Sequence, residues 1–164
     1  GVTTFFLDHK IDTGKMILQK EFDIPVTADV EYVYDGLMNL GAQAAVDTLN
    51  VVLEHGKDIP TTPQKEDENL QPAPKIFKET CKINWNQSDE KIYNFVRGLS
   101  PYPGVWTLLY KEAVGTIVVD KGRILVATTN NYLSIEELQL AGKRRMNAKD
   151  FLNGFKNLEQ YMLK

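Results

Sequence analysis

A polar, proline-rich stretch in the middle of the chain is the feature that most limits how these 164 residues can fold. Residues 57–75 read KDIPTTPQKEDENLQPAPK and contain four prolines, several charges and almost no large apolar side chains. Such a segment cannot join a packed core, and its prolines favour extended backbone. We therefore predict a linker over 57–75, with one unit before it, 1–56, and another after it, 76–164.

The two predicted units differ in charge. Residues 1–74 hold 5 Lys and Arg against 13 Asp and Glu, a net charge of −8, whereas residues 75–164 hold 14 against 9, a net charge of +5. Opposite signs favour two modules, and the second module suits a polyanionic partner. An ordinary solvated surface accounts equally well for so modest a positive charge.

The single cysteine and the lack of long apolar runs indicate the cellular compartment in which the protein is expected. Cys81 is the only cysteine, so no intrachain disulfide can form, and we expect it to be a small apolar filler. No apolar run approaches the roughly 18 residues that cross a bilayer. We therefore expect a cytoplasmic protein with no membrane association.

The first unit shows the pattern of two strands and a helix. Residues 2–7 and 16–24 favour strands, Gly14 between them permits a turn, and residues 27–56 have one apolar helical face. These elements resemble the closing part of an α/β domain and are too few for a complete one. Because Gly1 begins within a strand pattern, we expect the chain to be a piece of a longer protein.

The second unit is predicted to be a small barrel. Ser88 is placed to cap one helix and Asn147 to cap another near the end of the chain. Four strand candidates lie between these helices, at 105–110, 115–119, 123–128 and 132–139. Short strands with close turns and one helix favour a barrel of the oligonucleotide-binding type.

Common catalytic motifs are absent, since the sequence has no Gly-rich phosphate loop, Cys-x-x-Cys, His-Glu-x-x-His or Gly-x-Ser-x-Gly. The stretch IDTGKM, residues 11–16, nevertheless places an acid, a hydroxyl and a glycine between the first two strands. Local chemistry favours Asp12 as the polar residue of a turn, with a catalytic carboxylate as the alternative. His9 lies three residues earlier, and a His/Asp catalytic pair is a further alternative.

Three stretches strongly resemble the methionyl-tRNA formyltransferase family, in that family's order: GVTTFFLDHKIDTGKMILQ, INWNQSDEKIYNFVRGLSPYPGVW and LSIEELQLAGKRRMNAKDFLNG. The first resembles the end of the family's Rossmann-like formyl-transfer domain. The other two resemble the start and the end of its C-terminal barrel domain. The resemblance thus implies an α/β remnant followed by a small β-barrel of the oligonucleotide-binding type with flanking helices.

The resemblance also implies an activity. The family transfers a formyl group from 10-formyltetrahydrofolate to the amino group of methionyl initiator tRNA, for translation initiation. Its Asp-Thr-Gly motif corresponds to Asp12, Thr13 and Gly14, which makes Asp12 the catalytic candidate and the other two loop-shaping residues. The family's catalytic Asn and His belong to upstream sequence, and His9 does not match that histidine.

Several expectations follow from the resemblance. The folate site should lie largely upstream, no metal is needed, and the 164-residue chain alone should be inactive. The full-length enzyme is expected to be a monomer whose partner is initiator methionyl-tRNA.

A basic run near the end of the chain is the candidate tRNA contact. Lys143, Arg144 and Arg145 are consecutive, and Lys149 follows about one helical turn later. On the family's barrel domain, such residues would meet tRNA phosphates and contribute salt-dependent affinity. The alternative is a structural role, in which these basic side chains cap the preceding strand and neutralise charge on the helix that follows.

Two other functions remain open. A formyltransferase for an amino-sugar nucleotide shares the Asp-Thr-Gly loop. The basic run GKRRM argues against this function, because a small sugar nucleotide needs no such basic surface. A free-standing RNA-binding module would need only residues 76–164.

The sequence also departs from the family inside the barrel. LLYKEAVGTIV has almost nothing where the family usually has a further strand and loop. Either this barrel is one strand short, or residues between Glu112 and Ala113 are missing from this sequence. We expect the second, because a barrel short of one strand would have an exposed edge.

Overall fold

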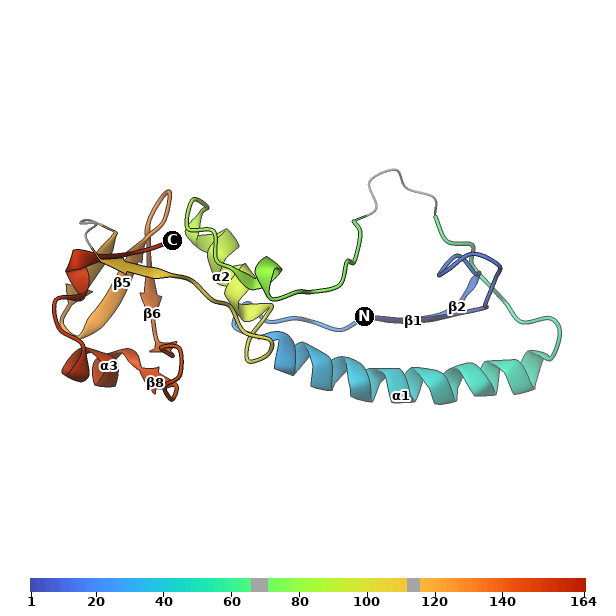
Figure 1. Cartoon of the computed structure of the whole chain (residues 1–164). Coiled ribbons are helices and arrows are strands. Elements are labelled where there is room, and N and C mark those ends of the chain that lie inside the picture. The colour runs from blue at the N-terminus through green and yellow to red at the C-terminus, as the bar shows by residue number, and fades with distance from the viewer. Residues whose placement is uncertain (66–70, 112–115) are drawn as a thin grey trace. The chain divides into compact units, whose positions relative to one another are not determined.

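The computed structural model describes residues 1–65, 71–111 and 116–164. Their backbone divides into two compact units, Gly1–Lys75 and Ile76–Lys164. Figure 1 draws the first unit in blue to green and the second in green to red. The junction of Glu112 and Ala113, where we expect missing residues, lies outside the described part of the chain.

The first unit is a hairpin packed beside one long helix (Figure 1). Strand β1, Val2–Phe5, pairs antiparallel with β2, Met16–Lys20, so that Thr3 lies opposite Gln19. Helix α1, Val30–His55, runs without interruption for 26 residues. The predicted strands and helix of this unit are therefore confirmed.

Local chemistry explains both ends of α1. The carboxylate of Asp29 accepts a hydrogen bond from the amide of Tyr32 at 3.1 Å, which satisfies one of the free N–H groups at the helix start. At the other end, Gly56 takes a positive φ of 55° and its amide bonds the carbonyl of Val52.

One face of α1 covers the hairpin. Ala44 is buried there, the hydroxyls of Thr4 and Thr48 bond at 2.8 Å, and Lys20 forms an ion pair with Asp47. Large apolar side chains elsewhere on the helix are exposed: Tyr34, Met38, Val46, Leu49 and Leu53. The helix therefore has more apolar surface than this hairpin buries.

The second unit begins with a short 3-10 helix, η1, Glu79–Cys81, followed by helix α2, Asp89–Arg97. The Ser88 hydroxyl accepts a hydrogen bond from the amide of Lys91, so the predicted cap is confirmed. Cys81 is buried, with 2% of its surface exposed.

The strands of the second unit form three small antiparallel sheets. The three-stranded sheet contains β4, β5 and β6, which are Ile117–Asp120, Arg123–Ala127 and Tyr132–Ile135. Two further pairs are β3, Leu109–Lys111, with β9, Tyr161–Leu163, and β7, Glu137–Leu138, with β8, Met146–Asn147.

These strands do not close a barrel among the described residues, because β3 is paired only with β9 and β4 only with β5. The expected strand 132–139 is also divided in two. The carbonyl of Glu136, between the two parts, accepts a hydrogen bond from the amide of Ala148 at 2.9 Å. This bond joins the divided strand to the start of helix α3, Ala148–Gly154, whose predicted cap, Asn147, is confirmed.

The core of the second unit lies between its three-stranded sheet and the C-terminal elements. Phe151 of α3 and Leu158 of the 3-10 helix η2, Leu158–Gln160, pack there with Ile117, Ile124 and Val126.

Among the described helices, none combines the length and the apolar character needed to cross a membrane.

Candidate functional site

The loop between β1 and β2 carries Asp12, Thr13 and Gly14. Asp12 is exposed and has a φ of 57°, in the left-handed region that Asp and Asn enter more readily than other side chains. The Thr13 hydroxyl donates to the carbonyl of Lys10 at 3.3 Å. The loop is thus a tight local turn that presents the carboxylate outward.

Gly14 is the sterically fixed position of this loop. It is buried, and a Cβ added to it would lie 1.5 Å from the carbonyl oxygen of Phe6. The backbone around it is tied down as well, because the amide of Phe6 donates to the carbonyl of Lys15 at 3.0 Å. A side chain at this position requires the loop to move.

Gln64 holds the same loop from a distant part of the chain. Its side-chain amide donates to the carbonyl of Asp12 at 2.9 Å and to that of Gly14 at 2.7 Å. The backbone of Thr62 exchanges two 2.8 Å hydrogen bonds with Met16 at the start of β2. Residues 62–64 lie inside the predicted linker, and sequence patterns gave no signal that they would contact the loop.

The neighbouring histidine is not paired with Asp12. The backbone amide of His9 donates to the carboxylate of Asp8 at 2.6 Å, and among the described residues no hydrogen bond joins the side chains of His9 and Asp12. The described residues also contain no cluster of His, Cys, Asp and Glu suited to a metal ion. The exposed Asp12 carboxylate accepts no hydrogen bond within the described part of the chain.

The basic run connects β7 and β8 in the second unit. Its backbone is held by a 2.7 Å hydrogen bond from the Gln139 side chain to the carbonyl of Lys143. The Arg145 guanidinium lies 3.0 Å from the Glu137 carboxylate in a pair that is about half exposed. Arg144 and Lys149, the latter in the first turn of α3, are exposed.

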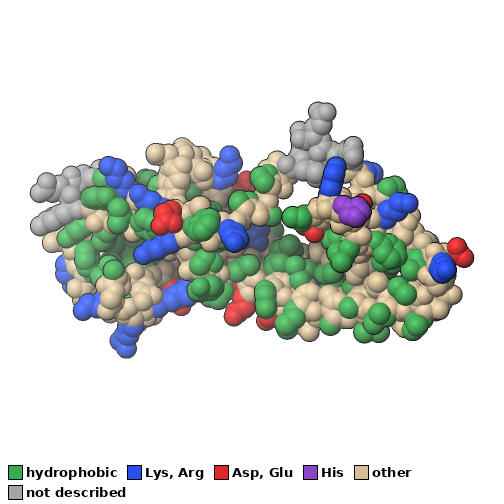
Figure 2. Space-filling view, turned by 45° about the vertical axis from the view of Figure 1, so that its right-hand side comes forward, with side chains coloured by type: hydrophobic (Ala, Val, Ile, Leu, Met, Phe, Trp, Pro, Cys, Tyr) green, Lys and Arg blue, Asp and Glu red, His purple; other side chains and the backbone are tan. Residues whose placement is uncertain are grey.

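Arg145 therefore already has an anionic partner, the carboxylate of Glu137 on β7. Figure 2 shows that Lys and Arg side chains are spread over the visible face of the second unit, with hydrophobic side chains between them. Cationic side chains on this face are therefore not confined to one isolated cluster.

Comparison with known proteins identifies the family of the second unit. The family described as "Formyl transferase, C-terminal domain" matches residues 75–116 and 109–156. Together these matches cover half of the chain.

Curated relatives extend the similarity to the first unit. The chain is 46% identical to a methionyl-tRNA formyltransferase of Parabacteroides distasonis, over 98% of this chain and 57% of the relative. It is 41% identical to the enzyme of that name from Bacteroides fragilis, over 100% of this chain and 58% of the relative. The chain therefore spans somewhat more than half the length of the curated relatives that it matches.

Solved structures share the fold at lower identity. HypX from Aquifex aeolicus, as its A392F-I419F variant, matches 93% of this chain and 30% of its own with a TM-score of 0.54 and 19% identity. HypX in complex with tetrahydrofolic acid gives the same TM-score at 17% identity, over 94% of this chain and 30% of its own. The fold, the family match and the identity to curated relatives agree. The chain belongs to the formyl transferase family and corresponds to the carboxyl-terminal portion of methionyl-tRNA formyltransferases.

Proposed function

We propose that this chain is the carboxyl-terminal part of an enzyme that transfers a formyl group from 10-formyltetrahydrofolate to the amino group of methionyl initiator tRNA. The observation that carries the proposal is the identity of 41–46% to proteins named methionyl-tRNA formyltransferase over nearly the whole chain. HypX, whose fold the chain shares, was solved with tetrahydrofolic acid, in keeping with a folate donor. The proposed site of action is the cytoplasm, with the full-length enzyme as a monomer.

Asp12 is the proposed catalytic residue of this chain. In the reaction, the methionyl nitrogen bonds to the formyl carbon, the bond from that carbon to the folate nitrogen breaks, and a proton leaves the attacking amine for the folate nitrogen. A carboxylate near the amine favours removal of that proton, directly or through a neighbouring imidazole. The anchored loop and the outward carboxylate of Asp12 support this role.

The two units have separate proposed roles. Residues 1–56 are the end of a Rossmann-like formyl-transfer domain, and residues 57–75 connect it to the second unit. Residues 76–164 form a small β-sheet domain of the oligonucleotide-binding type that contacts tRNA. The exposed apolar side chains of α1, including Tyr34 and Leu53, support the first assignment, because a face of this kind is normally covered by further parts of a domain. The net charge of +5 supports the second assignment.

The catalytic proposal is tested with a fusion. The upstream part of the Parabacteroides distasonis relative is joined ahead of Gly1, and formyl transfer to methionyl initiator tRNA is measured. We expect the fusion to be active, the 164-residue chain alone to be inactive, and Asp12→Asn to lower the rate by about a hundredfold or more. Asp8→Asn, an exposed acid of the same loop, is the matched control and should keep most of the activity.

The same fusion separates this proposal from the amino-sugar-nucleotide alternative. Formyl transfer to an amino-sugar nucleotide, with none to the tRNA, would favour that alternative. Full RNA affinity in the 164-residue chain combined with an inactive fusion would favour the free-standing binding module.

The tRNA proposal is tested by salt-dependent binding. Replacing Lys143, Arg144 and Lys149 with Ala should weaken tRNA binding and lower the slope of log K against log salt by about one for each phosphate that the protein no longer neutralises. Arg145→Ala should have a smaller effect, because its guanidinium is paired with Glu137. Lys121→Ala, an exposed cation in the turn between β4 and β5, serves as the control.

A further inference from the structure

Residues 62–64 extend the hairpin of the first unit next to the loop that carries Asp12. Met16, the first residue of β2, pairs with Phe5 on one side and with Thr62 on the other. The Thr62 pairing consists of two backbone hydrogen bonds of 2.8 Å, one in each direction. This exchange fixes the backbone two residues before Gln64, so the Gln64 side chain starts from a defined place beside the loop.

The Gln64 side chain restrains both ends of the Asp-Thr-Gly motif. Its Nε2 atom lies 2.9 Å from the carbonyl oxygen of Asp12 and 2.7 Å from that of Gly14. Because both partners are acceptors, only the NH₂ group of the amide, with its two donors, can bond them at the same time. One carbonyl precedes Thr13 and the other lies beyond it, so a single side chain holds the backbone before and after this residue.

The backbone of Asp12 is the part of the loop that most needs such a restraint. Its φ of 57° lies in the left-handed region, where a residue with a Cβ atom is less stable than in the extended or right-handed helical region. A conformation of this kind persists when the surrounding contacts hold it. Since φ sets the direction in which Cβ leaves the backbone, a change of φ at Asp12 would turn its carboxylate away from its present direction.

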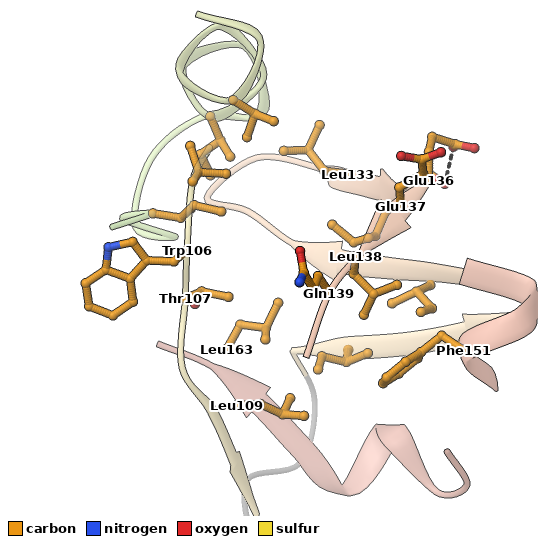
Figure 3. Close-up of a pocket in the computed structure, with 18 of the residues that line it drawn as sticks. Trp106, Thr107, Leu109, Leu133, Glu136, Glu137, Leu138, Gln139, Phe151 and Leu163 are labelled. Atoms are coloured by element: carbon orange, nitrogen blue, oxygen red, sulfur yellow. Dashed lines mark hydrogen bonds between the residues drawn. The ribbon is translucent and has the colours of Figure 1, made fainter. Parts of the chain in front are cut away.

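A glutamine of the second unit makes a comparable bond in a different region. The side-chain amide of Gln139 donates to the carbonyl of Lys143 at 2.7 Å and so holds the backbone of the basic run. Figure 3 shows Gln139 among the side chains that line a cavity of that unit. One glutamine thus restrains the loop to which catalysis is assigned, and the other restrains the run to which tRNA binding is assigned. Their effects on kcat and KM should therefore differ.

We propose that Gln64 is a positioning residue for formyl transfer, because its amide holds the backbone of Asp12 in the conformation that directs the carboxylate toward the attacking amine. Gln64 acts through Asp12 and needs no contact with either substrate. The inference rests on the proposed function, in which this carboxylate favours removal of the proton from the amine. Since a displacement of about 1 Å can lower a rate by about a hundredfold, loss of the anchor should appear in kcat.

The test uses the fusion of the upstream part of the Parabacteroides distasonis relative with this chain. Gln64→Met keeps the length and the neutrality of the side chain but removes both donors. We expect kcat to fall by about tenfold or more and KM for the tRNA to change by less than about twofold. Gln139→Met should instead raise KM. Gln19→Met, at an exposed position whose amide makes a 3.3 Å bond to the Thr3 hydroxyl, is the matched control and should change neither constant.

A double substitution separates positioning from a general loss of stability. In the Asp12→Asn fusion, Gln64→Met should lower kcat by less than about a further twofold, because no carboxylate is left to position. A general loss of stability would lower the activity by the same factor in both backgrounds. Gln64→Asn keeps the amide on a side chain that is one carbon shorter, and it should behave as Gln64→Met does. This variant decides the question if Gln64→Met does not fold.

The loop can also be observed in the 164-residue chain, without any activity. Nitrogen relaxation in NMR measures order parameters for the amides of Asp12 and Thr13. We expect values of about 0.85 in the unmodified chain and in Gln19→Met, and values below about 0.6 in Gln64→Met. Equal order in all three proteins would overturn the proposal.

The outcomes distinguish this inference from the proposed function. An unmodified fusion that transfers no formyl group would overturn the proposed function, and the role of Gln64 with it. An active fusion in which Gln64→Met behaves like Gln19→Met would overturn the role of Gln64 alone. Equal losses from Gln64→Met with and without Asp12→Asn would do the same.

Discussion

The side-chain amide of Gln64 donates a 2.7 Å hydrogen bond to the carbonyl of Gly14, although 50 residues separate the two in the chain. A second bond from the same amide reaches the carbonyl of Asp12 at 2.9 Å. The turn that presents the candidate catalytic carboxylate is therefore closed by a residue from a proline-rich segment. Its geometry depends on contacts that neither strand of the hairpin provides.

Gln64→Ala should loosen this turn without unfolding the chain. Loss of both bonds is expected to cost about 1 kcal/mol in local stability, the usual net value for hydrogen bonds near a surface. Hydrogen exchange should therefore become faster at Met16, whose amide bonds the carbonyl of Thr62. Gln19→Ala is the matched control, because its amide makes only an exposed 3.3 Å bond to the Thr3 hydroxyl. Equal effects of the two substitutions would contradict the anchoring role.

Gly14→Ala and Gly41→Ala should have opposite effects. The methyl group at position 14 would meet the Phe6 carbonyl oxygen, so we expect a loss of about 3 kcal/mol. A Cβ at position 41, inside α1, meets nothing within 4 Å, so we expect a gain of about 0.5–1 kcal/mol from helix propensity. Urea unfolding followed by circular dichroism measures both changes. Loss of stability in Gly41→Ala would show that the helix is distorted at that glycine.

Phe151→Ala should strongly destabilise the second unit. Its ring is 3% exposed in the core and stacks on the Phe155 ring at 4.9 Å between centroids. Truncation is expected to cost about 3–5 kcal/mol. Phe77→Ala removes the same side chain from a position that is 60% exposed and should cost less than about 1 kcal/mol. Urea unfolding followed by fluorescence reports on this unit alone, since both tryptophans, Trp85 and Trp106, belong to it.

Asp89 should make the second unit sensitive to acid. A hydrogen bond from the Asn130 side-chain amide, 3.0 Å long, is the main cause that lowers the pKa of the Asp89 carboxyl below its ordinary 3.8, and the backbone amide of Glu90 adds to it. A carboxyl with a lowered pKa in the folded state stabilises that state above pH 3.8. This stabilisation disappears as the pH falls below 3.8 and through the lowered folded-state value.

Two variants test the acid sensitivity. Asp89→Asn should lower the unfolding temperature at pH 6 and leave it nearly unchanged at a pH below the folded-state pKa, where the native carboxyl is also neutral. Asn130→Ala should move the pKa of Asp89 back toward 3.8, which carbon NMR of the carboxyl group detects directly. An Asp89 pKa that does not rise in Asn130→Ala would refute the assigned cause.

Local chemistry was enough to predict the helices. Ser88 and Asn147 each cap the helix predicted to follow them, because a cap involves only residues three positions apart. Helix α1 also continues without interruption through Gly41. One glycine costs only about 1 kcal/mol in a helix, which the packing of α1 on the hairpin offsets.

Contacts between distant residues were not predictable from these patterns. The pairing of β3 with β9 joins Leu109 to Leu163, and no periodicity within either strand specifies such a partner. The hydrogen bond from Gln64 to Gly14 could not be predicted for the same reason, since a glutamine among prolines is typical of a solvated linker. The turn at Gly14 was predictable because a glycine between two strand patterns is a local signal, whereas its anchor is not.

Because Cys81 is buried, the rate at which its thiol reacts with a reagent can measure local opening of the second unit. The sequence holds this one thiol, and 2% of its residue surface is exposed. Thiol reagents modify only an accessible sulfur, so the rate of labelling reports how often the region around η1 opens. The fraction of molecules that have gained one mass increment, followed over time, would report the opening rate without a fluorescent tag or an introduced residue.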